Sequence, residues 1–160
     1  MPPRRSKSKA PDDPAAARLR ALRLLARREH GARELEYKLA ARGIAGERAA
    51  EVVQELARSG WQSDTRYVAS LVRQRVDQGY GPLRIEAELE AAGVAQALIH
   101  EALADCGADW KALAIAIQER KFGEPPRSAA EWQKQFRHLA GRGFDAGQIR
   151  AALKGEEPEE

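Results

Sequence analysis

A repeat with a period of fifty residues constrains the fold of this chain more than any other feature. Three leucines and three glycines recur at that spacing, and each glycine is followed by an apolar residue. Two further apolar positions repeat in the segment that comes next. The aligned residues are Leu39, Leu89 and Leu139; Gly43, Gly93 and Gly143; Ile44, Val94 and Phe144; Ala49, Ile99 and Ile149; and Val53, Leu103 and Leu153. A fixed period of this length indicates supersecondary units in tandem.

Each repeat is predicted to hold three short helices, and the middle repeat shows this most clearly. Either Asp64 or Ser63 can cap a helix that Gly79 ends. Pro82 suits the first turn of a second helix, and Gly93 suits its end. Good helix formers dominate the composition, and aromatic residues make up only 6% of it. We therefore predict an all-α chain whose three tandem three-helix repeats form an elongated, curved array.

The segment boundaries follow from composition and from the repeat. The first residues combine proline, serine and charge with almost nothing apolar, which is typical of a disordered basic tail. The last residues are acidic and are expected to fray. The predicted segments are an N-terminal tail at 1–13, repeats at 14–60, 61–107 and 108–154, and a C-terminal tail at 155–160.

Two helix starts carry specific signals. Asp13 precedes Pro14 and is predicted to cap the first helix. Ser128 is followed three residues later by Glu131, the pattern of a capping box in which each side chain bonds the other residue's backbone N–H. The apolar face of the first helix is predicted at Leu22, Leu25 and Ala26, and that of the helix after Ser128 at Trp132, Phe136 and Leu139.

The net charge of +3 is distributed unevenly. Residues 18–60 carry a net charge of +4, residues 61–108 carry −3, and residues 109–153 carry +3. This pattern suits a mixed partner such as a protein bound to nucleic acid, and it suits an ordinary solvated surface equally well.

No pattern of catalytic or ligand-binding residues is present in the sequence. There is no phosphate-binding loop and no serine in a nucleophile elbow, and His30, His100 and His138 lie far apart. We therefore predict no enzymatic activity, no cofactor and no metal site. The single cysteine, Cys106, suits a reducing cytoplasm, and no apolar run is long enough to span a membrane.

A helix-turn-helix DNA reader is one alternative for the first repeat. Its second helix would carry Glu47, Glu51 and Glu55, which is a poor surface for a phosphate backbone. Sequence-specific DNA reading is therefore disfavoured. Trp61 and Tyr80 fall at turns, where an aromatic ring can stack on a base, anchor a partner, or fill the junction between repeats.

Together, residues 18–154 resemble the RecX family of bacterial regulators of the RecA recombinase. The residues that carry the resemblance are Asp64, Tyr67, Arg73, Gly79-Tyr80-Gly81-Pro82, Arg84-Ile85, Leu89 and Gly93-Val94 in the middle repeat; Arg28-Glu29-His30, Glu34-Leu35 and Lys38-Leu39 in the first; and Lys121-Phe122-Gly123, Phe136, Leu139 and Arg142-Gly143-Phe144 in the third. One departure is the segment 60–63, where a small polar or Asn-type residue is expected before Asp64.

The resemblance implies a cytoplasmic, monomeric regulator in DNA repair, homologous recombination and the SOS response. Such a protein binds RecA and the RecA–DNA filament and mainly inhibits the recombinase, ATPase and coprotease activities of RecA, in part by lying in the filament groove. Weak direct binding to DNA is also expected. The alternative is a nucleic-acid-binding helical-repeat module that acts on its own.

Basic side chains that share a helix face are the candidate partner-binding residues. They are Arg20, Arg23 and Arg27 in the first repeat, Arg66 and Arg73 in the second, and Lys134 and Arg137 in the third. An acidic filament would attract such faces. The same residues would equally keep the surface soluble.

Overall fold

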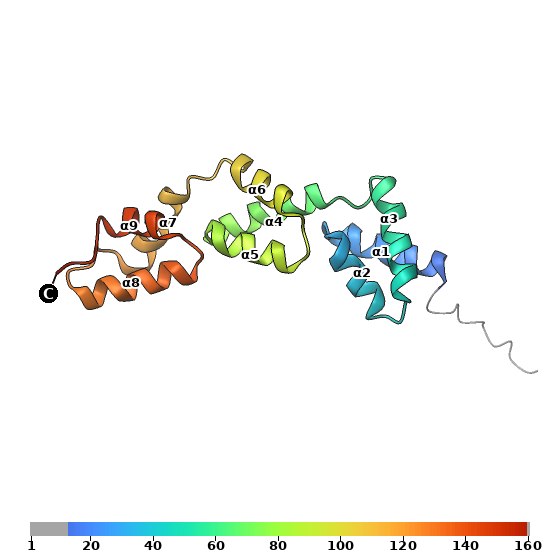
Figure 1. Cartoon of the computed structure of the whole chain (residues 1–160), viewed down its shortest axis with the longest axis horizontal. Coiled ribbons are helices and arrows are strands. Elements are labelled where there is room, and N and C mark those ends of the chain that lie inside the picture. The colour runs from blue at the N-terminus through green and yellow to red at the C-terminus, as the bar shows by residue number, and fades with distance from the viewer. Residues whose placement is uncertain (1–12, 160) are drawn as a thin grey trace, which may run out of the picture. The chain divides into compact units, whose positions relative to one another are not determined.

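The computed structural model of the chain describes residues 13–159, which form nine helices and no strand (Figure 1). The helices are α1 (Pro14–Arg27), α2 (Ala32–Ala40), α3 (Gly46–Arg58), α4 (Asp64–Asp77), α5 (Pro82–Ala91), α6 (Gln96–Asp105), α7 (Trp110–Phe122), α8 (Ala129–Gly141) and α9 (Ala146–Leu153). The predicted all-α class and the three helices of each repeat are confirmed. The predicted N-terminal tail lies outside the described residues except for Asp13.

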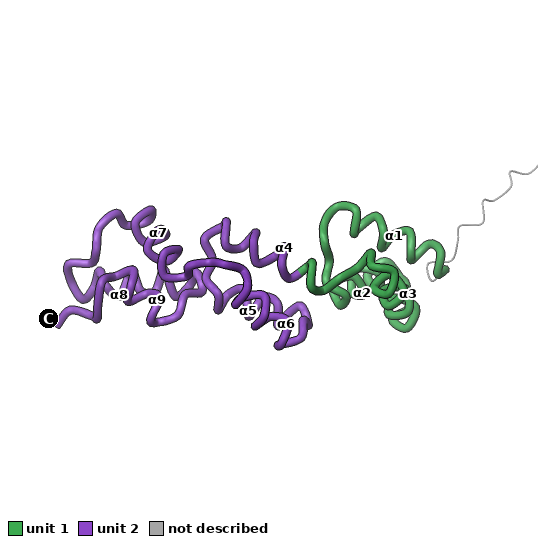
Figure 2. Tube along the Cα trace, turned by 90° about the horizontal axis from the view of Figure 1, so that it is seen from above, with its two compact units in different colours: residues 1–67 green, residues 68–160 purple. Residues whose placement is uncertain are grey.

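The chain forms two compact units, and the division falls within α4 (Figure 2). The first unit ends at Tyr67, and the second begins at Val68. The first therefore contains α1–α3 and the first turn of α4, while the second contains the remaining helices. The predicted domain boundaries and the curvature of the array stay predictions.

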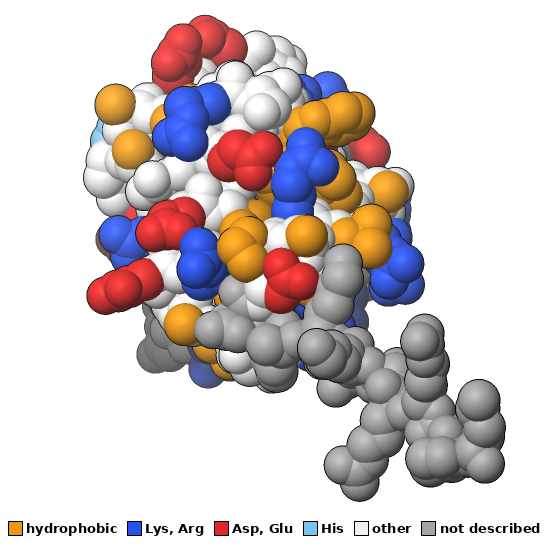
Figure 3. Space-filling view, turned by 90° about the vertical axis from the view of Figure 1, so that its right-hand side faces the viewer, with side chains coloured by type: hydrophobic (Ala, Val, Ile, Leu, Met, Phe, Trp, Pro, Cys, Tyr) orange, Lys and Arg blue, Asp and Glu red, His pale blue; other side chains and the backbone are white. Residues whose placement is uncertain are grey.

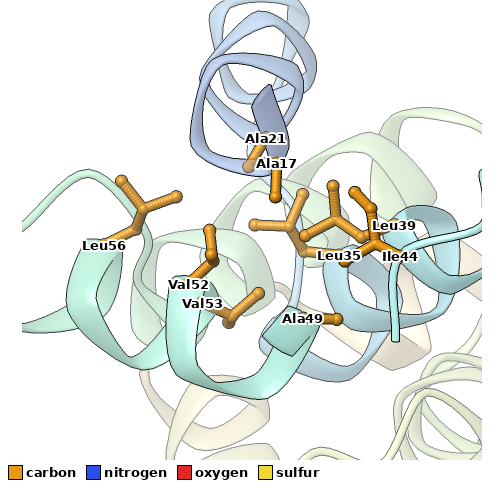
Figure 4. Packing of buried hydrophobic residues seen from close by; sticks show 9 residues of the cluster. All are labelled: Ala17, Ala21, Leu35, Leu39, Ile44, Ala49, Val52, Val53 and Leu56. Carbon is orange, nitrogen blue, oxygen red and sulfur yellow. The ribbon is translucent and has the colours of Figure 1, made fainter. Parts of the chain in front are cut away.

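The core of the first unit lies between α1, α2 and α3 (Figure 4). Leu35, Leu39 and Leu56 are fully buried there, and α1 contributes Ala17 and Ala21. Because alanine side chains are small, the backbone of α1 can pack close to the neighbouring helices without leaving a cavity. The predicted apolar face of α1 is offset from this core: its two leucines are half-buried and Ala26 is exposed.

The repeat in the sequence is a repeat of core positions. Leu39, Leu89 and Leu139 are all fully buried. The aligned positions after each glycine and at the start of the next helix are buried as well. Leu103 is the exception, since it is only half-buried whereas Val53 and Leu153 are buried. The glycines themselves end each second helix with positive φ, at 88° for Gly43, 78° for Gly93 and 97° for Gly143, a conformation that L side chains rarely adopt.

The third trio of helices has its own core in the second unit. Helices α7 and α9 lie side by side, and α8 covers them. The buried residues of this core include Ile117, Leu139, Phe144 and Ile149. The predicted apolar face of α8 is confirmed, because Trp132 and Phe136 pack against this core and stack on each other at 5.0 Å between ring centroids.

The helix caps follow the sequence in part. Asp13 caps α1 by accepting a hydrogen bond from Ala15 N at 3.1 Å, as predicted. Ser128 caps α8, but the Glu131 carboxylate accepts from the backbone N–H of Arg127 at 2.7 Å. The predicted capping box is therefore only half formed. A complete capping box occurs instead at α9, between Asp145 and its third following residue.

Candidate partner-binding surface

The seven basic residues predicted to bind a partner are all exposed. Arg20, Arg23 and Arg27 lie on α1, and none of them forms an ion pair or hydrogen bond through its side chain with any described residue. Their spacing of three and four residues places them on one face of the helix. We call these three residues the α1 arginine stripe. A guanidinium without an internal partner offers five donors to an external carboxylate or phosphate.

A smaller basic pair lies on α8. Lys134 and Arg137 are one turn apart, exposed, and without an ion-pair partner among residues 13–159. Lys134 also lines an open cavity of about 280 Å³ beside Arg127 and Glu131. This cavity carries both signs of charge, so it is less suited to an acidic partner than the α1 arginine stripe. Arg73 of α4 is likewise exposed and unpaired within the described chain.

Arg66 is the exception among the seven, because its guanidinium is used within the first unit. It donates to the Glu29 carboxylate at 2.9 Å, to Gly60 O at 2.8 Å and to Trp61 O at 3.2 Å. These bonds join the turn after α1 to the loop before α4. They give a structural reason for an arginine at this position, and a role for Arg66 in partner binding stays a prediction.

Asp64 caps a different helix from the one that it begins. Ser63 Oγ accepts from Arg66 N at 3.2 Å and so caps α4, which settles the choice left open between the two residues. Asp64 Oδ1 instead accepts from Ala32 N, the first residue of α2, at 2.8 Å. The buried Gln62 side chain donates to the same carboxylate oxygen at 2.9 Å. The start of α4 is thereby fixed to the start of α2.

The turn between α1 and α2 packs against the same segment. Gly31 has no side chain to cap α2. A Cβ at Gly31 would lie 3.0 Å from the ring of Tyr67, so the aromatic ring occupies the space that a larger residue would need. The close packing of the Tyr67 ring on this turn therefore gives a structural reason for a glycine at position 31 and for a tyrosine at position 67.

The histidines are packing residues or surface residues. His30 is buried, with Nδ1 at 3.0 Å from Arg28 O and Nε2 at 3.0 Å from the Lys38 ammonium. Burial lowers the pKa of His30, and the lysine donates to the neutral ring. Burial, together with Lys121 nearby, also lowers the pKa of His138. The His30 ring thus fills space and satisfies a backbone carbonyl, while the His138 ring packs edge-on against Phe122 at 5.5 Å between centroids.

No metal-binding cluster is present among residues 13–159, where no three His, Cys, Asp or Glu side chains gather closely enough to hold an ion. His100 is exposed, at 3.4 Å from the Glu86 carboxylate, and Cys106 is exposed as a free thiol. The described helices are too short or too polar to span a bilayer.

The Gly79-Tyr80-Gly81-Pro82 turn is hydrogen-bonded to the turn between α8 and α9 and packs closely against it. We call this contact the Gly81–Gly143 contact. Gly81 N donates to Arg142 O at 2.7 Å, and Leu83 N donates to Gly143 O at 2.9 Å. The two backbones touch, because a Cβ at Gly81 would lie 2.4 Å from Gly143 O, and one at Gly143 would lie 2.4 Å from Arg84 Cβ. Only glycine fits on both sides of this contact.

Tyr80 packs beside the Gly81–Gly143 contact. Its ring lies between two guanidiniums, that of Arg84 at 4.1 Å and that of Arg142 at 4.3 Å from the ring centroid. The Arg142 guanidinium also donates to Gln78 O at 2.5 Å and to Gly79 O at 3.2 Å, which satisfies carbonyls at the end of α4. Among the roles considered for Tyr80, the contacts favour filling a junction between repeats. The sequence analysis names Arg142 only as part of the resemblance and does not predict these contacts, because its partners lie more than sixty residues away.

Comparison with known proteins shows a match to three family models. The matched descriptions are "RecX, first three-helix domain" over residues 17–56, "RecX, second three-helix domain" over residues 63–103, and "RecX, third three-helix domain" over residues 109–153. The three matches follow the three trios of helices along the chain.

Curated relatives match over most of their length. The chain is 46% identical over 136 residues to "Regulatory protein RecX" of Xanthomonas campestris pv. campestris (strain B100), covering 84% of each chain. It is 44% identical to "Regulatory protein RecX" of Stenotrophomonas maltophilia (strain K279a), covering 84% of this chain and 83% of the relative. The crystal structure of RecX from Lactobacillus salivarius is 20% identical with a TM-score of 0.75, covering 91% of this chain and 97% of that one, and so supports the fold.

Proposed function

The chain belongs to the RecX family of regulatory proteins, and from this premise we propose that it binds RecA and RecA–DNA filaments. In this proposal it mainly inhibits the recombinase, ATPase and coprotease activities of RecA by lying in the filament groove. It acts as a monomer in the cytoplasm, within homologous recombination, DNA repair and the SOS response. Family membership across all three domains carries the proposal.

The exposed charges support this function physically. A filament of protein and nucleic acid presents carboxylates and phosphates, and the α1 arginine stripe offers guanidiniums without internal partners among the described residues. Lys134, Arg137 and Arg73 provide further exposed cations on other helices. A binder that works by occupying a groove needs such dispersed contacts and requires no active site.

Co-sedimentation tests the proposal directly. The chain is mixed with RecA assembled on single-stranded DNA, and in parallel with bare single-stranded and double-stranded DNA at the same salt. We expect it to pellet with the RecA filament far more than with bare DNA, and to lower the ATPase rate of RecA in the same mixture. Equal retention on coated and bare DNA, with no effect on the ATPase, would contradict the proposal.

The second candidate is a nucleic-acid-binding module that acts without RecA. The uneven charge favours it, since residues 18–60 and 109–153 are both net basic. Binding to bare DNA would then weaken steeply as salt rises, and RecA would add nothing to it. The same co-sedimentation series separates the two functions, because only one of them requires RecA on the DNA.

A further inference from the structure

The acidic segment after α9 turns back onto the third trio of helices. We call its described residues, 155–159, the acidic tail. Lys154 ends α9 in a left-handed conformation with a φ angle of 61°, which a lysine rarely adopts, and Gly155 N donates to Arg150 O at 3.0 Å. Figures 1 and 2 both show the chain after α9 beside the start of α8. Pro158 is half-buried, so the acidic tail lies against the helices.

Two carboxylates hold the acidic tail on two helices. Glu156 Oε2 accepts from Arg150 Nε of α9 at 3.1 Å. Glu157 Oε1 accepts from the Gln133 side-chain amide of α8 at 2.7 Å. Arg137 lies one turn after Gln133 on the same face of α8, and it is exposed and unpaired within the described chain. We call Gln133, Arg137 and Arg150 the tail seat.

The acidic tail balances the charge of the trio on which it lies. Residues 109–153 carry a net charge of +3, and residues 154–160 carry one basic and four acidic side chains, a net charge of −3. The contacts are nevertheless open to water, since the Arg150 side chain is 46% exposed and that of Glu156 is 76% exposed. Exposed ion pairs are weak and are screened by salt, so a competing polyanion can displace the acidic tail.

We propose that the tail seat binds the phosphate backbone of nucleic acid, and that the acidic tail occupies this site as an internal competitor. A guanidinium binds a phosphate through the same N–H donors that it offers to a carboxylate, so a phosphate takes the place of Glu156 on Arg150. A second phosphate reaches Arg137, and the Gln133 amide donates as amides commonly do to phosphate oxygens. A nucleic acid also releases counterions on binding, which favours it over the short acidic tail.

A phosphate backbone suits the tail seat better than an acidic peptide does. All three side chains of the tail seat end in N–H donors and are aligned along helix surfaces, and such contacts bind a regular row of phosphates without reading sequence. This inference goes beyond the proposed function, because it concerns bare nucleic acid and does not require RecA.

Removal of the acidic tail tests the proposal without RecA. The full chain and a chain that ends at Gly155 are titrated into a fluorescein-labelled thirty-nucleotide oligo-dT at low salt, and fluorescence anisotropy gives both affinities. We expect the shortened chain to bind about threefold more tightly or better, as the release of an exposed ion pair predicts. Its affinity should also fall more steeply with salt, because it contacts more phosphates. Circular dichroism melts establish that both chains are folded.

Arg150→Gln distinguishes competition from a general effect of charge. In the shortened chain this variant should remove most of the gain in affinity. In the full chain it should change the affinity little, because Glu156 already occupies the guanidinium. Such non-additivity is expected only where the acidic tail and the DNA use the same group.

Two double variants of the full chain supply a matched control. Glu156→Gln with Glu157→Gln should reproduce the gain of the shortened chain. Glu36→Gln with Glu101→Gln removes the same charge from two carboxylates that have no ion-pair partner among the described residues, and it should leave the affinity nearly unchanged. This control is needed because acidic and basic side chains are interspersed elsewhere on the surface, as Figure 3 shows for one face.

Four results would overturn the proposal. They are equal affinity of the full and shortened chains, absence of DNA binding by both at low salt, an equal gain from the Glu36→Gln and Glu101→Gln control, and displacement of the oligo-dT from the shortened chain by poly-glutamate more readily than by unlabelled oligo-dT. The last would assign the tail seat to an acidic protein segment. Because RecA is absent from every arm, the outcome is independent of the co-sedimentation test.

Discussion

Replacing Gly81 by alanine should weaken the Gly81–Gly143 contact between the α4–α5 turn and the α8–α9 turn. The φ angle of Gly81 is −87°, which alanine adopts freely, so the backbone conformation itself adds no cost. The added Cβ would lie 2.4 Å from Gly143 O and 2.6 Å from Phe144 N, both backbone atoms that cannot rotate away. The effect therefore isolates the close approach of two backbones.

The magnitude follows from the two ways in which the chain can respond. If the α8–α9 turn moves away, the bonds from Gly81 N and Leu83 N are lost, and each contributes about 0.5–1.5 kcal/mol. If the turn stays, the overpacked methyl group costs about 1–3 kcal/mol. Either response predicts a loss of about 1–3 kcal/mol in the free energy of unfolding.

A urea melt followed by circular dichroism measures this loss, and amide hydrogen exchange locates it. The Leu83 amide should exchange faster in the variant, because its bond to Gly143 O at 2.9 Å is weakened or broken. The control is Gly46→Ala at the start of α3, where an added Cβ meets nothing within 4 Å and stability should be unchanged or slightly higher. Unchanged stability and unchanged Leu83 exchange in Gly81→Ala would refute the reasoning.

Three further predictions concern the core, the surface charge and pH. Leu89→Ala should lower the free energy of unfolding by about 2–5 kcal/mol in a denaturant melt, because Leu89 is fully buried; a loss below about 1 kcal/mol would contradict its place in the core. Reversing the α1 arginine stripe to glutamate should weaken co-sedimentation with RecA filaments while the thermal melt stays nearly unchanged; binding of the unaltered chain should weaken as salt rises, and the difference between the two should be largest at low salt, because ions screen exposed charges; intact binding would exclude the stripe. Burial lowers the pKa of His30 below its unfolded value, so the unfolded chain takes up the proton first and stability should fall as pH drops below about 6.5. Thermal melts across that range should show a smaller fall in His30→Gln.

The repeat predicted the core because it is a local property of each trio of helices. A leucine at a fixed place before a helix-ending glycine faces inward wherever the trio recurs, and Leu39, Leu89 and Leu139 are all fully buried. The exposure of the α1 arginine stripe was predictable for the same reason, since three residues at helical spacing share a face. Leu103 departs from the pattern, and nothing in its local sequence separates it from Leu153.

Contacts between distant segments could not be predicted from the sequence. Local rules assign Asp64 to its own helix, whereas its carboxylate caps α2, thirty-two residues earlier. The same rules give Arg66 an exposed face, whereas its guanidinium holds Glu29 and the loop before α4. A charged or polar side chain has several donors or acceptors, and only the tertiary arrangement decides which backbone groups it meets.

The residues of the family motif and the exposed residues differ in how free their groups are to contact a partner. Asp64, Tyr67 and Gly81 belong to the motif that resembles the RecX family, and each is engaged in an internal contact: a helix cap, a ring packed on a turn, or the Gly81–Gly143 contact. Side chains engaged in this way have few groups left for another molecule. The α1 arginine stripe and Trp61 have the opposite character, since their functional groups or ring faces lie exposed at the surface. The motif therefore accounts for how the helices are joined, and the exposed residues of α1 together with Trp61 are the better targets for mutations that separate binding from folding.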